Sequence, residues 1–139
     1  MSVLCDTSFL WAARNLRDSH HARAVELLRE LLRGEHGKPH LTDLIFMEAV
    51  TLALARTGRH SAAVGTGDML RQERGGKRLF LLHHVTPNHV EAAWKELCRH
   101  TDKALSMTDW TSVVVARELE LDAIVSFDEG FDGLFPRLL

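Results

Sequence analysis

The sequence has few cysteines, no long hydrophobic run and no large excess of charge of one sign. Its two cysteines, Cys5 and Cys98, stand in no Cys-x-x-Cys or Cys/His spacing, which argues against zinc and favours two buried, reduced cysteines in a cytoplasmic protein. Its apolar stretches are far shorter than the roughly 20 residues that a membrane helix needs. We therefore expect no membrane segment, and, without a basic leader, no cleaved signal peptide.

The composition is that of an ordinary folded protein. The chain has 139 residues, of which 45% are hydrophobic and 26% charged, and its net charge is -2. This length suits one domain with a three-layer core, so we expect a single domain over residues 1–139. The charge does not indicate a polybasic nucleic-acid binder, although a local basic stripe can still bind phosphates on such a surface.

Apolar runs and helical periodicity alternate along the chain. Short apolar runs predict strands at 3–5, 39–41, 79–82 and 123–125. Amphipathic spacing and capping residues predict helices from about 8, and over about 20–32, 42–56, 61–74, 87–100 and 109–118, the fourth weakened by Gly65 and Gly67. Strands separated by helices form parallel βαβ units, so the expected class is α/β with helices on both faces of the sheet.

Four acidic residues stand at the ends or starts of these elements. Asp6 and Asp128 each follow a predicted strand, and the carboxyl ends of parallel strands meet in one crevice. Asp109 stands at a helix start, and Glu48 lies about two turns into a helix among apolar neighbours. Each residue also has a local explanation, as a helix cap, a turn residue or a solvent-facing side chain.

Taken together, the four acids indicate a cation site. Clustered carboxylates repel each other unless they are protonated or neutralised, and oxygen ligands without His or Cys select Mg²⁺ or Mn²⁺. Such an ion activates and positions water for phosphodiester hydrolysis. Thr7 and Ser8, next to Asp6, are expected to assist as hydrogen-bonding residues, with helix capping as an equally good explanation.

At this point the chain resembles the PIN-domain ribonucleases, and among them the VapC-like toxins of type II VapBC toxin–antitoxin pairs. The segments that carry the resemblance are Val3–Ser8, Glu48 within residues 44–52, Ser106–Asp109, and Ile124–Asp128 followed by Phe131. The resemblance implies a three-layer α/β/α PIN-like fold with a central, mainly parallel sheet of four to five strands. Because little chain follows Asp128, its last edge strand is expected to be absent or reduced.

The resemblance also implies a function. It implies a Mg²⁺- or Mn²⁺-dependent endoribonuclease in which Asp6, Glu48, Asp109 and Asp128 are both catalytic residues and metal ligands. Ser8 matches the small polar residue that the family commonly keeps near its first Asp, and Asp132 is a candidate auxiliary acid. The implied partners are an RNA substrate, a cognate antitoxin and a second copy of the chain in a homodimer.

Basic residues near the first acid are the candidates for contact with RNA phosphates. We favour Arg14 and Arg17, which follow the Asp6 turn, over Arg56, Arg59 and the basic stretch 71–78. The nine histidines have no metal-ligand spacing and receive no role. The three tryptophans are expected in the core or in a subunit contact: Trp11, Trp94 and Trp110.

Three alternatives remain open at the level of sequence. One is a housekeeping PIN nuclease of RNA processing, which the neighbouring gene would distinguish from a toxin. Another is a catalytically silent PIN module, against which the presence of all four acids argues. The third is a magnesium-binding phosphoacceptor signalling domain, but such domains expect an acidic pair after the first strand and a late lysine. Here only Asp6 follows that strand, and no lysine follows Lys103.

Overall fold

The computed structural model describes all 139 residues and contains one central five-stranded sheet. Its strands are β1 (Val3–Cys5), β2 (Pro39–Thr42), β5 (Leu81–His83), β6 (Ala123–Val125) and β7 (Arg137–Leu138). The spatial order is β5-β2-β1-β6-β7, and every neighbouring pair is parallel. The predicted parallel α/β sheet is therefore confirmed.

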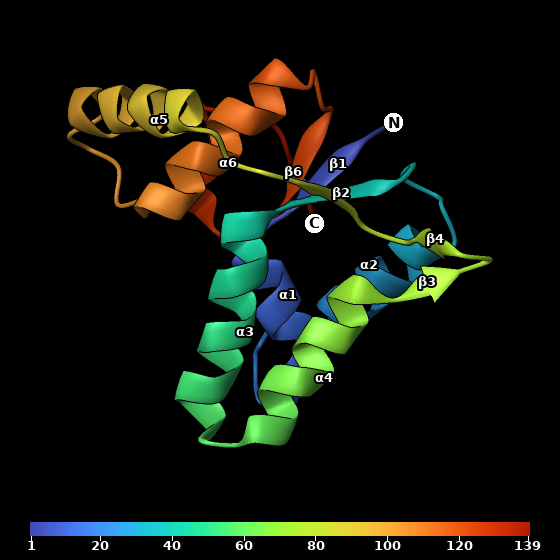
Figure 1. The fold of residues 1–139 in the computed structure, drawn as a ribbon. Helices are drawn as coiled ribbons and strands as arrows, with labels where there is room; N and C mark the ends of the chain where they lie inside the picture. Colours follow the sequence, from blue (N-terminus) through green and yellow to red (C-terminus); the bar gives the residue numbers. More distant parts are fainter.

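Six helices connect and cover these strands. They are α1 (Thr7–Arg14), α2 (His21–Leu32), α3 (Asp43–Thr57), α4 (His60–Arg71), α5 (Pro87–Arg99) and α6 (Met107–Glu118). Figure 1 shows α5 and α6 together on one side of the molecule and α1 to α4 on the other, with the α3–α4 hairpin extending away from the sheet. None of these helices has the length and apolar character needed to span a bilayer.

The core lies around the central strand. All three residues of β1 are fully buried, as expected for a strand with neighbours on both sides and helices on both faces. Large side chains from the flanking helices fill the remaining space, among them Phe9 of α1 and Trp110 of α6. These contacts belong to one continuous hydrophobic cluster, so the chain folds around a single core.

The region between α3 and β5 differs from the prediction. Helix α4 runs through Gly65 and Gly67 without interruption but ends at Arg71, because residues 73–78 form a short hairpin of β3 (Glu73–Arg74) and β4 (Lys77–Arg78). Strand β5 starts at Leu81 and was expected to be buried, whereas Leu82 is 48% exposed. That expectation was wrong because β5 is an edge strand with a neighbour on one side only.

Two further boundaries differ at the C-terminal half. Helix α6 begins at Met107 with Ser106 as its N-cap, so Asp109 lies in its first turn. The final edge strand is present in reduced form as the two residues of β7, which pair with β6.

The strand order defines where a ligand site should form. If only the five strands of the central sheet are counted in chain order, their spatial order is 3-2-1-4-5. The direction of this order reverses between β1 and β6. In open α/β sheets, ligands bind in the crevice at the carboxyl ends of the strands at this reversal. Receiver-like folds have the order 2-1-3-4-5 instead, so the topology disagrees with the phosphoacceptor alternative.

Candidate active site

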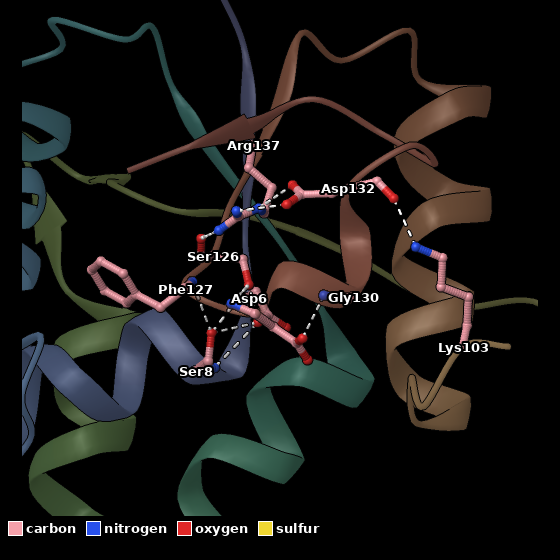
Figure 2. Close-up of polar contacts among 9 residues, drawn as sticks. Asp6, Ser8, Lys103, Ser126, Phe127, Gly130, Asp132 and Arg137 are labelled. Atoms are coloured by element: carbon pink, nitrogen blue, oxygen red, sulfur yellow. Dashed lines mark hydrogen bonds and ion pairs between the residues drawn. The ribbon is translucent and has the colours of Figure 1, made fainter.

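Asp6 lies at the reversal point, directly after β1, and is only 3% exposed. It is the N-cap of α1, and its Oδ2 accepts a hydrogen bond from the Ser8 backbone N at 3.3 Å. The same oxygen accepts from Ser8 Oγ at 2.7 Å and from Ser126 Oγ at 2.8 Å (Figure 2). The carboxylate is therefore held in one orientation from both neighbouring strand ends.

Ser126 links the two central strands, and sequence reasoning assigned it no role. It follows β6, is fully buried, and its Oγ also accepts from the backbone N of Asp128 at 3.0 Å. Ser8 Oγ and Ser126 Oγ lie 3.1 Å apart, so the two hydroxyls and Asp6 form one hydrogen-bond network. The available signal was positional: Ser126 follows its strand as Asp6 follows β1.

Asp109 and Asp128 are each oriented by a local cap. Asp109 and the N-cap Ser106 form a capping box, in which Asp109 Oδ2 accepts from the Ser106 N at 2.8 Å and Ser106 Oγ accepts from the Asp109 N at 3.1 Å. Asp128 caps the short 3₁₀ helix Glu129–Phe131 and accepts from the Gly130 N at 2.8 Å. The local explanations considered for these acids are thus correct, and they coexist with a shared site.

Electrostatics joins Asp6, Asp109 and Asp128 into what we call the acidic cluster. The pKa of Asp109 is raised to about 7, first by burial and then by the negative charges of Asp6 and Asp128. Burial also raises the pKa of Asp6, against the opposing effect of the hydrogen bonds from Ser8 and Ser126. Three carboxylates from distant parts of the sequence therefore lie within electrostatic reach of one another.

Glu48, the fourth predicted acid, is not joined to this cluster in the structure. It is half-buried on α3 and forms no hydrogen bond or ion pair. Its charge is also not among the causes that shift the pKa of Asp6 or Asp109. Its role as a ligand or catalytic residue stays a prediction.

Asp132, the predicted auxiliary acid, is engaged by an arginine. Both of its carboxylate oxygens accept from Arg137, at 2.6 and 3.0 Å, and this pairing lowers its pKa. Arg137 also donates to the carbonyl of Ser126 at 3.2 Å, and Lys103 Nζ donates to the carbonyl of Asp132 at 2.8 Å (Figure 2). The geometry gives Asp132 the role of holding Arg137 against the end of β6.

The donor chemistry of the acidic cluster fits a hard divalent cation. None of its three carboxylates forms an ion pair with a Lys, Arg or His side chain, although Asp128 lies within electrostatic reach of Arg137. Beside Asp6, the Oγ1 of Thr7 is the one buried side-chain polar atom of the protein without a hydrogen-bond partner. The side chains form no group of three or more His, Cys, Asp or Glu residues placed to hold a metal ion, so the fit concerns the chemistry of the donors and not a complete set of ligands. Magnesium does not need such a set, because it typically takes one or two carboxylates directly and keeps water for its other positions.

The remaining predicted residues lie away from the cluster. Arg14 is exposed at the C-terminal end of α1, about 12 Å along the helix from Asp6 at 1.5 Å per residue, and Arg17 is exposed just beyond this helix. Trp110 lies in the core, and Trp94 is 55% exposed, so for Trp94 only the predicted subunit contact stays open. Cys5 is buried as predicted, but the same prediction was wrong for Cys98, which is exposed on α5. His20, which was given no role, stacks on Phe127 with ring centroids 4.3 Å apart.

Comparison with known proteins shows similarity to a characterised endonuclease. No family model matches the chain, but it is 28% identical over 134 residues to the 23S rRNA-specific endonuclease VapC20 of Mycobacterium tuberculosis, covering 94% of this chain and 92% of the relative. The same identity is found to VapC20 of a second strain of that organism.

The fold leads to the same protein. The crystal structure of M. tuberculosis VapC20, described as a toxin that cleaves the sarcin–ricin loop, superposes with a TM-score of 0.77 over 93% of this chain and 92% of that chain, at 28% sequence identity. Sequence and fold therefore agree: along nearly its whole length, this chain is similar to the toxin VapC20.

Proposed function

We propose that the protein is an endoribonuclease toxin of the VapC type that hydrolyses RNA phosphodiester bonds with Mg²⁺ or Mn²⁺ at the acidic cluster. The observation that carries the proposal is the set of three electrostatically coupled carboxylates, without a cationic partner, at the reversal point of the sheet. The similarity to VapC20 along nearly the whole chain supports the same reaction. The proposed metal ligands are Asp6, Asp109 and Asp128, with Glu48 as a further candidate.

Each protein group has a separable task in this proposal. The bound ion would lower the pKa of a water molecule and offset charge on the scissile phosphate. Ser8 and Ser126 fix the orientation of Asp6 through hydrogen bonds at 2.7 and 2.8 Å. The N-termini of α1 and α6 both lie at the cluster, since Asp6 caps the first and Asp109 lies in the first turn of the second. Their backbone N–H groups and dipoles favour an anionic phosphate there.

The partners follow from the same similarity. An RNA substrate and a cognate antitoxin are those of a VapC toxin, and we extend the proposal to a homodimer in solution. A housekeeping nuclease would have the same site without an antitoxin. An antitoxin gene beside this one supports the toxin, and its absence supports the housekeeping alternative.

Cleavage of RNA by the purified protein tests the proposal. With Mn²⁺ or Mg²⁺, the protein should cut a ribosomal RNA fragment that contains the sarcin–ricin loop, which is the first substrate to try because VapC20 cleaves it. The Asp6→Asn variant should lose this activity by at least two orders of magnitude, as expected when a group that positions the reacting water is removed. Asp68→Asn is the matched control, because Asp68 is exposed on α4 and lies far from all three cluster residues in sequence.

Two results would contradict the proposal. Cleavage that continues after chelation by EDTA would exclude the metal. Full activity of Asp6→Asn would exclude the acidic cluster as the site, whatever the substrate.

A further inference from the structure

A large basic hollow lies at the end of the helices that is remote from the acidic cluster. It has a volume of about 1000 Å³ and lies between the C-terminal end of α1 and the α3–α4 hairpin. Its lining consists of Trp11, Arg14, Asn15, Leu16, Arg17, Ala53, Arg56, Thr57, Arg59, Ser61, Ala62 and Thr66. Four of these residues are arginines and none is acidic, so the hollow concentrates positive charge on a protein whose net charge is -2.

We call this space the arginine hollow, and its four arginines have no acidic partner in the protein. Arg14, Arg17, Arg56 and Arg59 form no ion pair, and their guanidinium groups donate no hydrogen bond to the protein. Elsewhere the same residue type is commonly paired, as Arg137 is with Asp132. The donors of the arginine hollow are therefore available for a ligand.

Two contacts position guanidinium groups within the hollow. Arg56 lies over the ring of Trp11, 5.2 Å from its centroid, in a cation–π contact that leaves the edge of the guanidinium group free. Arg14 lies against Gly65 of α4, where a Cβ atom would collide with its Nη2. The glycine that was expected to weaken α4 thus makes room for an arginine.

The chemistry of the hollow selects a polyanion. Four like charges around one space repel each other, and an anionic ligand with several charges relieves this repulsion. Guanidinium groups bind phosphates through two parallel hydrogen bonds and stack on planar rings, and both properties suit a nucleic-acid backbone. A ribonuclease substrate supplies such phosphates in a continuous chain.

The position of the hollow relates it to the acidic cluster. Helix α1 has Asp6 as its N-cap and carries Arg14 at its end, eight residues later. At 1.5 Å per residue, this separation is about 12 Å along the helix. An RNA strand leaving the acidic cluster along α1 would reach the hollow within a few nucleotides.

We propose that the arginine hollow binds the phosphate backbone of RNA a few nucleotides away from the bond that is cleaved at the acidic cluster. The inference rests on the proposed function for its substrate class. In this proposal the hollow contributes to the affinity for RNA and not to the cleavage reaction, because no acidic residue lines it.

Binding of a labelled single-stranded oligoribonucleotide of mixed sequence, measured by fluorescence anisotropy in EDTA, tests the inference without cleavage. Each Arg→Gln substitution in the hollow should weaken RNA binding. It should also make the fall of log K with the logarithm of the salt concentration less steep, by about 0.7 for one substitution and about 2.8 for all four. Lys95→Gln with Arg99→Gln is the matched control, since both residues are exposed on α5, on the other side of the molecule in Figure 1. Gly65→Ala adds a variant without charge change, which should displace Arg14 and weaken binding less than Arg14→Gln does.

Circular dichroism confirms that each variant is folded, and the outcomes separate the two proposals. Equal RNA binding by the hollow variants and the unmodified protein would overturn this inference. The inference would also be overturned if the hollow variants lost binding to polyglutamate but kept binding to RNA. That result would indicate an acidic protein segment as the occupant. Metal-dependent cleavage without arginine-dependent binding would leave the proposed function intact, whereas arginine-dependent binding without any cleavage would refute the proposed function alone.

Discussion

At the scale of single residues, Ser126 is the side chain that most directly controls the geometry of Asp6. Its Oγ donates to Asp6 and accepts from the backbone of Asp128, so it fixes the distance between two members of the acidic cluster. Hydrogen-bond partners behind metal-binding carboxylates typically contribute 10- to 100-fold to metal affinity or activity. Their loss leaves a buried carboxylate oxygen with fewer donors.

We therefore expect Ser126→Ala to lower RNA cleavage, and the affinity for activating Mn²⁺, by about 10- to 100-fold. Mn²⁺ titration of the cleavage rate measures both quantities. Ser112→Ala is the control, because Ser112 is equally buried but donates to the carbonyl of Thr108 instead of a carboxylate. Equal rates for the two variants would mean that Ser126 only fills space.

At the scale of elements, β7 is the shortest strand of the sheet and depends on Arg137. Its two residues pair with β6, and the Arg137 side chain reaches both Asp132 and the carbonyl of Ser126. An element with so few backbone hydrogen bonds opens easily unless side chains hold it. These contacts of Arg137 thus connect β7 to the segment that follows β6 and contains Ser126 and Asp128.

Arg137→Gln should weaken these contacts with Asp132 and with the carbonyl of Ser126. We expect faster hydrogen exchange in β7 and at the end of β6, a lower melting temperature and reduced cleavage. Hydrogen–deuterium exchange with mass spectrometry localises the effect, and Arg99→Gln on α5 is the control for loss of a surface charge. Unchanged exchange at residues 123–128 would show that Arg137 does not support the active site.

Most elements were predictable because their periodicity and caps are local properties. Asp6, Thr42 and Ser106 begin α1, α3 and α6 as residues of their type commonly do. The exposure of β5 was not predictable, because an apolar run does not show whether a strand has one neighbour or two.

The candidate site was predictable in part for the same physical reason. Asp6 and Asp128 were expected to meet because carboxyl ends of parallel strands converge. Ser126 and the Arg137–Asp132 pair depend on contacts between segments whose distance in space the sequence does not encode locally. The hollow likewise forms only when the ends of α1 and α3 come together.

At the scale of the whole molecule, the acidic cluster couples folding to pH and to cations. The ordinary pKa of an aspartate side chain is 3.8, and burial raises the pKa of Asp109 to about 7 in the folded protein. The folded state therefore binds this proton more tightly than the unfolded state does. Its contribution to the free energy of unfolding is therefore full below about pH 3.8 and is lost as the pH rises toward 7. A divalent cation that binds only the folded protein acts in the opposite direction at high pH, by neutralising the ionised cluster.

The expected result is that Asp109→Asn raises the melting temperature of the metal-free protein, and that this gain over the unmodified protein grows between about pH 4 and pH 7. Acids with lowered pKa values, such as Asp132, contribute to stability in the opposite direction, but they are present in both proteins. Their contributions therefore cancel in the difference between the two melting temperatures. Mn²⁺ should then stabilise the unmodified protein by about 2.7 kcal/mol at a hundredfold excess over its Kd, and the variant by less. Differential scanning fluorimetry across pH, in EDTA and in Mn²⁺, measures each step. A pH-independent difference would show that the pKa of Asp109 is not raised in the folded protein. Equal stabilisation by Mn²⁺ would place the ion elsewhere on the protein.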